Sequence, residues 1–407
     1  MDIFFTQYDE RIVGESKRDP LGLQPIWSYF GSRVIKNITT VSNDFRGFRE
    51  TLLCLAIAGE CVNSNGGMLK QYILLFEQLF MYTMIDAGES DGIIGNDNGR
   101  ARLNKYDDPV ITWKSDQAPG TILKSEISIG YYGRYKTPLM NMGIIDSKSC
   151  LKPLSIDVES LFGKDYLIVK ESFKAFLKKR NHRFSDFDNK GRDALRNCVC
   201  GPFRRGEKDF WIGKINSDNL HDHKRDTLMY TCLDIFRDYL DYQDYQDWPN
   251  AESFFKELYK KSGSTDVENI LKIEPFLICI EYVFYNILNS RSVDDVKLPK
   301  ENYFEDCLAK AKTTCIEGSV ALKERFDRLF KDCGTYSDLV QGVLRYHKFV
   351  CDKKRSSYWA DITSSGNIHT FIHDGFFEDY KFWNRDYYYF AYRNIINGIE
   401  EADRWER

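Results

Sequence analysis

The sequence predicts a mainly α protein with a small mixed α/β region, a multi-helix architecture with no recognised superfold. Apolar residues recur at helical spacing from Asp44 to Ala87 and again from Asp157 to the end of the chain. Only the stretch between Gly88 and Pro153 combines glycine-rich turns with short β-branched runs. No repeat of solenoid period is present. These observations predict helices packed on helices, with strands confined to one region.

The N-terminal part of the chain predicts an irregular cap followed by a helical hairpin. Turn-forming Asp19-Pro20 and Gln24-Pro25 indicate the cap, which has room for one short strand or helix. The first helix begins near Asp44, and a break from Gly59 to Gly67 separates it from a second helix over 68–87. The two helices are expected to pack antiparallel.

The following stretch is where strands are expected. Runs at 110–113 and 122–129 are rich in isoleucine and valine and lie among glycines that favour turns. Beyond Asp157 helices dominate, with Asn250 as an N-cap and Pro275 kinking one helix or dividing it in two. The expected helices cover 165–180, 185–198, 224–242, 251–261, 267–290, 300–312, 319–330, 337–353 and 375–402.

Two domains are predicted from this change of pattern. Residues 1–155 form an N-terminal domain of helical hairpin and mixed region, and residues 156–407 form a helical C-terminal domain. A chain of 407 residues is long enough for two such units, and 43% hydrophobic residues can supply both cores.

Charge and cysteine content indicate which partners and which cellular compartment to expect. The 57 basic and 61 acidic residues nearly cancel, so attraction to an anionic partner must come from a local patch. Eleven cysteines are scattered without a disulfide framework, which is typical of a reducing cytoplasm. The N-terminus lacks the pattern of a signal peptide, and no apolar run of about 18 residues suggests a membrane span. A cytoplasmic protein without a membrane partner is predicted.

Catalytic and cofactor motifs are missing from the sequence. It contains no nucleotide-binding phosphate loop, dinucleotide fingerprint or serine-hydrolase elbow. The spacing of His369 and His373 fits a metal only weakly, because Thr370 stands where a zinc protease has glutamate. The pair Cys198 and Cys200 is too close for a zinc ribbon. We therefore expect no metal and no cofactor, and the catalytic residues are unknown.

A metal-dependent nuclease remains the alternative. Asp91, Asp107, Asp108 and Glu126 could supply two carboxylates for magnesium, as such nucleases require. However, Glu126 is followed by Ile127 and Ser128 instead of the diagnostic x-Lys. The chain is therefore predicted to bind nucleic acid or partner proteins, and whether it is also an enzyme is left uncertain.

The clearest functional feature is a basic stretch. Between Lys170 and Arg225 there are 15 basic and 8 acidic residues, whereas residues 226–260 contain 3 basic and 8 acidic ones. Such a stretch favours contact with the phosphates of DNA or RNA, although a solvated face that pairs with the acidic segment is an equal alternative. The predicted nucleic-acid-binding residues are Lys170, Lys174, Lys178, Lys179, Arg180, Arg183, Arg204 and Arg205.

The C-terminal segment is dense in aromatic residues. On the helix expected over 375–402, an aromatic stripe from Phe376 to Phe390 is predicted to face the core. Beside it, aromatic rings near solvent with arginines alongside are typical of a partner surface. The predicted partner-binding residues are Tyr388, Tyr392, Arg385 and Arg393.

Four short motifs carry a resemblance to known proteins: Asp19-Pro-Leu-Gly-Leu23, the threonine-rich run 37–42, Arg46-Gly-Phe48, and Glu89-Ser-Asp-Gly-Ile-Ile-Gly95. Over about the first 150 residues the chain resembles a broad group of uncharacterised bacterial proteins encoded near phage-defence and restriction genes. The resemblance implies a defence complex with ATPase, helicase or nuclease partners, and it carries no catalytic residues. We expect a non-catalytic subunit that binds nucleic-acid backbone, partner proteins or both.

Overall fold

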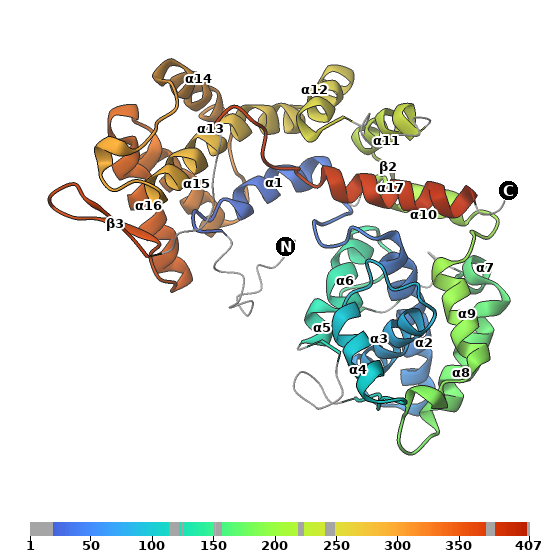
Figure 1. Cartoon of the computed structure of the whole chain (residues 1–407). Helices are drawn as coiled ribbons and strands as arrows, with labels where there is room; N and C mark the ends of the chain where they lie inside the picture. Colours follow the sequence, from blue (N-terminus) through green and yellow to red (C-terminus); the bar gives the residue numbers. More distant parts are fainter. Residues whose placement is uncertain are drawn as a thin grey trace. The chain divides into compact units, whose positions relative to one another are not determined.

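The computed structural model describes residues 19–113, 122–123, 125–149, 151, 157–218, 224–240, 249–371 and 379–404. Helices α1 to α17 occupy most of them (Figure 1), and the strands described pair only as two short antiparallel hairpins. The prediction of a mainly α fold with little β structure is confirmed.

The chain divides into two compact units. Unit 1 comprises Met1–Ile35 and Asp234–Tyr387, and unit 2 comprises Lys36–Leu233 and Tyr388–Arg407. The expected boundary between residues 155 and 156 lies outside the described residues, and the segments on both sides of it belong to unit 2. Packing accounts for this division, because α1 (Gln24–Val34) contacts α13 (Thr265–Leu288) and α17 (Tyr389–Arg404) contacts α2 (Phe45–Asn65). Each unit thus includes segments from distant parts of the sequence.

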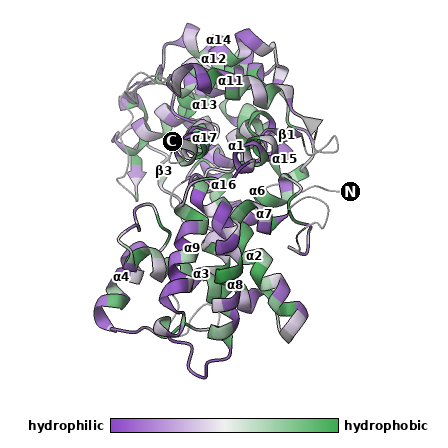
Figure 2. Ribbon diagram, turned by 90° about the vertical axis from the view of Figure 1, so that its right-hand side faces the viewer, coloured by the Kyte–Doolittle hydropathy of each residue, from purple (hydrophilic) through white to green (hydrophobic). Residues whose placement is uncertain are grey.

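Unit 2 is built around α2. Its predicted hairpin partner is α3 (Leu69–Asp86), and the break between them begins only at Gly66, so Gly59 lies within α2. Figure 2 shows α2 as largely hydrophobic, as expected for a helix that also contacts α6, α8, α9 and α17. The other elements are α4 (Asn96–Lys105), α5 (Glu126–Ile129), α6 (Tyr131–Asn141), α7 (Val158–Phe162), α8 (Lys164–Leu177), η1 (Phe184–Asp186), α9 (Asn189–Cys200), α10 (Glu207–Ile215), β1 (Ser217–Asp218), β2 (Lys224–Arg225) and the first half of α11 (Thr227–Leu240).

The strands expected between Gly88 and Pro153 are absent from the described part of that stretch. Val110 forms an isolated bridge with Arg183, and Ile145 forms one with Leu151. Residues 126–129 form the short helix α5, so the expectation of a strand there is wrong. Alternating apolar residues in a short segment fit a buried helical turn as well as a strand. Here the packing of α5 against α6 favours the helical turn.

A buried ion pair joins α2 to α10. Arg49 Nε lies 2.9 Å from a carboxylate oxygen of Glu207, and both side chains are almost completely buried. Arg49 also donates to the carbonyl oxygens of Val199 and Gly201, at the end of α9. Trp211 donates its indole N–H to the same Glu207 carboxylate. Charge pairing, together with the hydrogen bonds that the two terminal guanidinium nitrogens make, offsets the cost of keeping these two ions in the core.

Two further buried acids in unit 2 form no ion pair with any residue that the structure describes. Glu50 of α2 accepts a hydrogen bond from the Thr51 hydroxyl at 3.1 Å, and Glu77 of α3 accepts one from the backbone N–H of Tyr132. The second oxygen of each carboxyl has no hydrogen-bond partner among the described residues. Burial raises the pKa of both groups, and the charge of Glu77 raises that of Glu50 further. A proton is therefore retained in this cluster at pH values where exposed glutamates are ionised.

This proton makes stability depend on pH. Because the pKa of Glu77 is raised on folding, the contribution of Glu77 to stability is greatest below the ordinary value of 4.5 and is lost as the pH rises toward the raised pKa. We expect Glu77→Gln to flatten this fall and to stabilise the protein at pH 8 by roughly 1–3 kcal/mol, since one pKa unit corresponds to about 1.4 kcal/mol. Thermal unfolding at pH 5 and pH 8 measures the difference, with Glu305→Gln, at an exposed position, as control. An equal loss of stability at both pH values would contradict the prediction.

Unit 1 is built around α13. This helix contacts α1, α12 (Ala251–Ser262), α14 (Glu301–Ala311) and α16 (Leu339–Lys354), and α15 (Val320–Cys333) packs on α16. Pro275 lies inside α13 without dividing it. Asn250 caps α12 as predicted, because its side chain accepts from Ser253 N–H at 2.9 Å. The remaining elements are the second half of α11, η3 (Val293–Asp295), η4 (Tyr336–Asp338) and the hairpin of β3 (Ala360–Ile362) and β4 (Ile368–Thr370).

The C-terminal helix begins later than the sequence predicts. Residues 372–378 lie outside the described residues, 379–388 are not helical, and α17 starts at Tyr389. Tyr387 and Tyr388 have positive φ angles of 47° and 71°, which a right-handed helix does not allow. The backbone N–H groups of Asn384 and Arg385 donate to Glu274 of α13 instead of to a helical carbonyl. Phe390, expected on the buried stripe, is 44% exposed.

The same geometry corrects the predicted partner surface. Tyr388 and Tyr392 are buried, so the expectation that their rings lie near solvent is wrong. Arg385 is also buried, where its guanidinium lies 3.1 Å from Glu274 and 2.7 Å from Glu281. Only Arg393 is partly exposed, with its guanidinium over the Phe390 ring. Three of the four residues are therefore part of cores and offer no surface to a partner.

The buried Arg385 should be indispensable for stability. Removing one member of a buried ion pair leaves the other charge without compensation, which typically costs about 3–5 kcal/mol. We expect Arg385→Ala to lower the free energy of unfolding by about that amount, whereas Lys381→Ala, at an exposed site nearby, should change it by less than about 0.5 kcal/mol. Denaturant unfolding measures both. Wild-type stability in Arg385→Ala would show that the pair contributes no net stability.

Candidate nucleic-acid interface

The predicted basic residues of α8 face an acid of α2. Lys170 lies 3.4 Å and Lys174 4.0 Å from the carboxylate of Glu60, and Lys174 lies 3.3 Å from Glu171 on its own helix. Lys170 also contacts the ring face of Tyr166. These two lysines are partly exposed and partly neutralised. On their own they can offer only a weakened positive charge to a ligand.

The turn that follows α8 is different. Lys178, Lys179 and Arg180 are exposed, and their side chains form no ion pair or hydrogen bond within the part of the chain that the structure describes. We call these three residues the basic turn. Their charges are close together in sequence and remain available, which is the arrangement that phosphate contacts require.

Backbone hydrogen bonds hold the basic turn in place on its C-terminal side. His182, buried and in a left-handed conformation, accepts from Ile111 N–H at 2.8 Å, and Phe184 N–H donates to Pro109 O. The Asp108 carboxylate accepts from the backbone N–H and the hydroxyl of Ser185. The turn is therefore tied to the segment 108–111.

The other predicted arginines do not add to the basic turn. Arg183 donates to the carbonyl of Asp108 at 3.0 Å and lies 4.0 Å from its carboxylate. Arg204 pairs with Asp165 at 2.8 Å, near the N-terminus of α8, and Arg205 follows it in an exposed position. At 1.5 Å per residue, Asp165 and Lys178 are about 20 Å apart along the helix. Arg204 and Arg205 thus lie toward the opposite end of α8, and the predicted set does not form one cluster.

A cavity of about 560 Å³ lies next to the basic turn. Lys174 lines it from α8, Lys178 from the position after that helix, Tyr72 from α3, and Trp113 from the segment that follows α4. Trp113 is 40% exposed, although its ring packs edge-on against His182 with centroids 4.9 Å apart. The remaining lining residues are Ser64, Glu171, Ala175 and Leu177.

The sequence predicts Trp113 only as the last residue of a strand-like run, not as a residue that binds a ligand. The sequence does contain a signal for exposure, because Trp113 is the last residue of its apolar run and is followed by Lys114 and Ser115. Its proximity to Lys174 and Lys178 depends on the packing of α8 and could not be found from spacing. The structure thus adds an aromatic side chain to the predicted cations.

The described ranges hold no cluster of metal-binding side chains. They contain no group of three His, Cys, Asp or Glu residues that could hold a metal ion. His369 lies on β4 opposite Asp361, whereas His373, His221 and His223 lie outside the described residues. Asp108, a candidate ligand of the nuclease alternative, is used to cap the chain at Ser185. Among the described helices, none combines the length and apolar character needed to cross a membrane.

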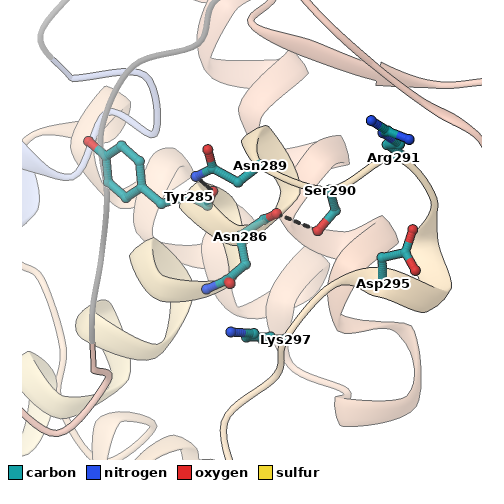
Figure 3. A pocket seen from close by; sticks show the side chains of 7 residues that line it. All are labelled: Tyr285, Asn286, Asn289, Ser290, Arg291, Asp295 and Lys297. Carbon is teal, nitrogen blue, oxygen red and sulfur yellow. Dashed lines mark hydrogen bonds between the residues drawn. The ribbon is translucent and has the colours of Figure 1, made fainter.

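A second cavity, of about 360 Å³, belongs to unit 1. Figure 3 shows Asn286, Asn289 and Ser290 at the end of α13, with Arg291 and Lys297 on the segment that follows. The two amides and the hydroxyl donate back to carbonyls of their own helix. The helix end is electronegative, and Asp295 adds a carboxylate to the lining. This mixed polar lining selects no particular ligand charge, and we place no functional site there.

The chain was compared with protein-family models, curated proteins and solved structures, and none of these comparisons found a match.

Proposed function

We propose that this protein is a non-catalytic binding subunit that contacts the phosphate backbone of DNA or RNA through the basic turn of unit 2. The observation that carries the proposal is the contrast along α8. Lys170 and Lys174 share the charge of Glu60, whereas Lys178, Lys179 and Arg180 are exposed and unpaired within the described structure. Unpaired cations that contact phosphates release counterions from the nucleic acid, and this release favours binding. Cations already neutralised in an ion-pair network would not contribute in this way.

The surrounding structure supports this proposal over a merely solvated face. The hydrogen bonds to Ile111, Pro109 and Asp108 hold the backbone beyond the turn. A fixed backbone reduces the entropy that is lost when a ligand orders the surface. The interaction with phosphates is independent of base sequence, since side chains that meet phosphates read no base.

The cellular context of the proposal is a bacterial anti-phage defence complex with ATPase, helicase or nuclease partners. It follows from the resemblance of the N-terminal motifs, beginning with Asp19-Pro-Leu-Gly-Leu23. The free thiols of the described cysteines support a reducing compartment such as the cytoplasm. The nuclease alternative is not proposed, because no observation on the described residues favours it.

Charge reversal tests the role of the basic turn. We expect the triple change Lys178→Glu, Lys179→Glu and Arg180→Glu to abolish binding of a labelled duplex DNA at about 0.15 M salt. In the parent protein, log Kd should rise steeply with log salt, by about 0.7–0.9 per phosphate contacted. Fluorescence anisotropy across a salt series measures both effects.

The matched control is Lys260→Glu, Lys323→Glu and Lys331→Glu, which makes the same charge change at exposed positions of unit 1. It should leave most of the affinity intact. Equal losses in both triple variants would mean that net charge alone drives binding. Salt-insensitive binding, or no binding by the parent at low salt, would refute the proposed function.

A further inference from the structure

The segment that presents Trp113 is held more firmly than an exposed loop needs to be. The side chain of Gln78, buried in α3, donates to the carbonyl of Thr112 at 2.8 Å and accepts from its N–H at 3.2 Å. The preceding residue, Ile111, donates its N–H to the carbonyl of His182. Both backbone groups of the residue before Trp113 are therefore occupied by one side chain.

The indole ring itself is braced from one direction. His182 contacts the ring edge-on and packs in turn against Phe176, whose centroid lies 5.0 Å away. Despite this support, Trp113 keeps 40% of its surface exposed beside the cavity. A large aromatic ring that is held rigid and left exposed is typical of a binding surface. A ligand that covers such a ring gains the free energy of burying its apolar surface.

The cavity has room for a planar group next to this ring. Its volume of about 560 Å³ lies in the range of small-ligand pockets, which is roughly 300–1,000 Å³. The lining also includes the largely buried Tyr72, whose hydroxyl donates to the carbonyl of Gly66 at 2.8 Å. Two aromatic side chains from different elements therefore line one recess.

Two lysines and Glu171 line the cavity, and the two further cations of the basic turn directly after Lys178 favour an anionic ligand. Lys178 is unpaired among the described residues, and Lys174 shares its charge with Glu171 and Glu60. Lys179 and Arg180 follow Lys178 directly in the chain and are exposed. An aromatic recess with cations at its edge matches one nucleotide, with its base against a ring and its phosphate against the lysines.

We propose that this cavity takes one unstacked base of single-stranded nucleic acid, with Trp113 as the stacking partner and Lys178 as a phosphate contact. The inference rests on the proposed function and deepens it, because it selects the single-stranded form. In a duplex each base is stacked on both faces and cannot enter a recess without being extruded. The basic turn would bind the backbone of either form, whereas the cavity would bind only the single strand.

Substitution of Trp113 separates the two contributions. We expect Trp113→Ala to weaken binding of oligo(dT) about 5- to 150-fold, the factor that corresponds to the about 1–3 kcal/mol gained per stacked base. Binding of a duplex of equal length should change less than about twofold. Trp113→Phe should retain most of the affinity for oligo(dT), because phenylalanine keeps an aromatic face.

Two further variants control for structure and for exposed aromatic area. Tyr106→Ala removes another exposed ring of unit 2, which is 49% exposed, and should leave oligo(dT) binding unchanged. Ala175→Trp fills the cavity from an exposed helical position while leaving residue 113 as tryptophan, and it should reproduce the selective loss. This second route keeps the test decisive if Trp113→Ala fails to fold.

The outcomes distinguish this inference from the proposed function. Binding of oligo(dT) and duplex that is lost on charge reversal but unaffected by Trp113→Ala and Ala175→Trp would overturn the cavity proposal and leave the backbone proposal standing. Equal loss for both nucleic acids in these two variants would also overturn it. Absence of any binding by the parent protein at low salt would refute both.

Discussion

The ion pair of Arg49 and Glu207 is the constraint on which unit 2 depends. Arg49 extends from the central helix α2 and holds the carbonyls that end α9 as well as the carboxylate that begins α10. Two buried charges are tolerated only if their hydrogen-bonding geometry is satisfied, so the positions of these three helices are linked. Since α9 packs along α8, the same interaction determines where the basic face of α8 lies.

In unit 1 a buried carboxylate, that of Glu274, links distant segments in a similar way. Glu274 is completely buried in α13 and receives hydrogen bonds from two backbone N–H groups, from the guanidinium of Arg385 and from the hydroxyl of Tyr387. A single acid thereby fixes the irregular segment that precedes α17. By contrast, Glu50 and Glu77 of unit 2 form no ion pair with a described residue, and burial raises the pKa of both carboxyls, which favours their protonated form.

The proposed function follows from residues that these internal interactions leave unused. Three arginines and two lysines of the basic stretch are paired with Glu60, Asp86, Asp108 or Asp165 and contribute to the structure of unit 2. The cations that these ion pairs leave unused include the basic turn, whose Lys178 lines one cavity together with the exposed ring of Trp113. Counting charges in the sequence overestimates the binding surface, because it cannot separate paired cations from free ones.

The sequence by itself determined the helical class, most helix positions after Asp157, the hairpin of α2 and α3, and the cap at Asn250. These features depend on interactions within a few residues, which periodicity and capping rules describe. It also located the basic turn, because three adjacent cations need no distant partner to be noticed. Only the tertiary structure decided that Tyr388, Tyr392 and Arg385 are buried, that Arg204 lies toward the other end of α8, and that Trp113 borders the lysines. Each of these depends on contacts between residues far apart in the chain, where the free energy of packing outweighs local preference.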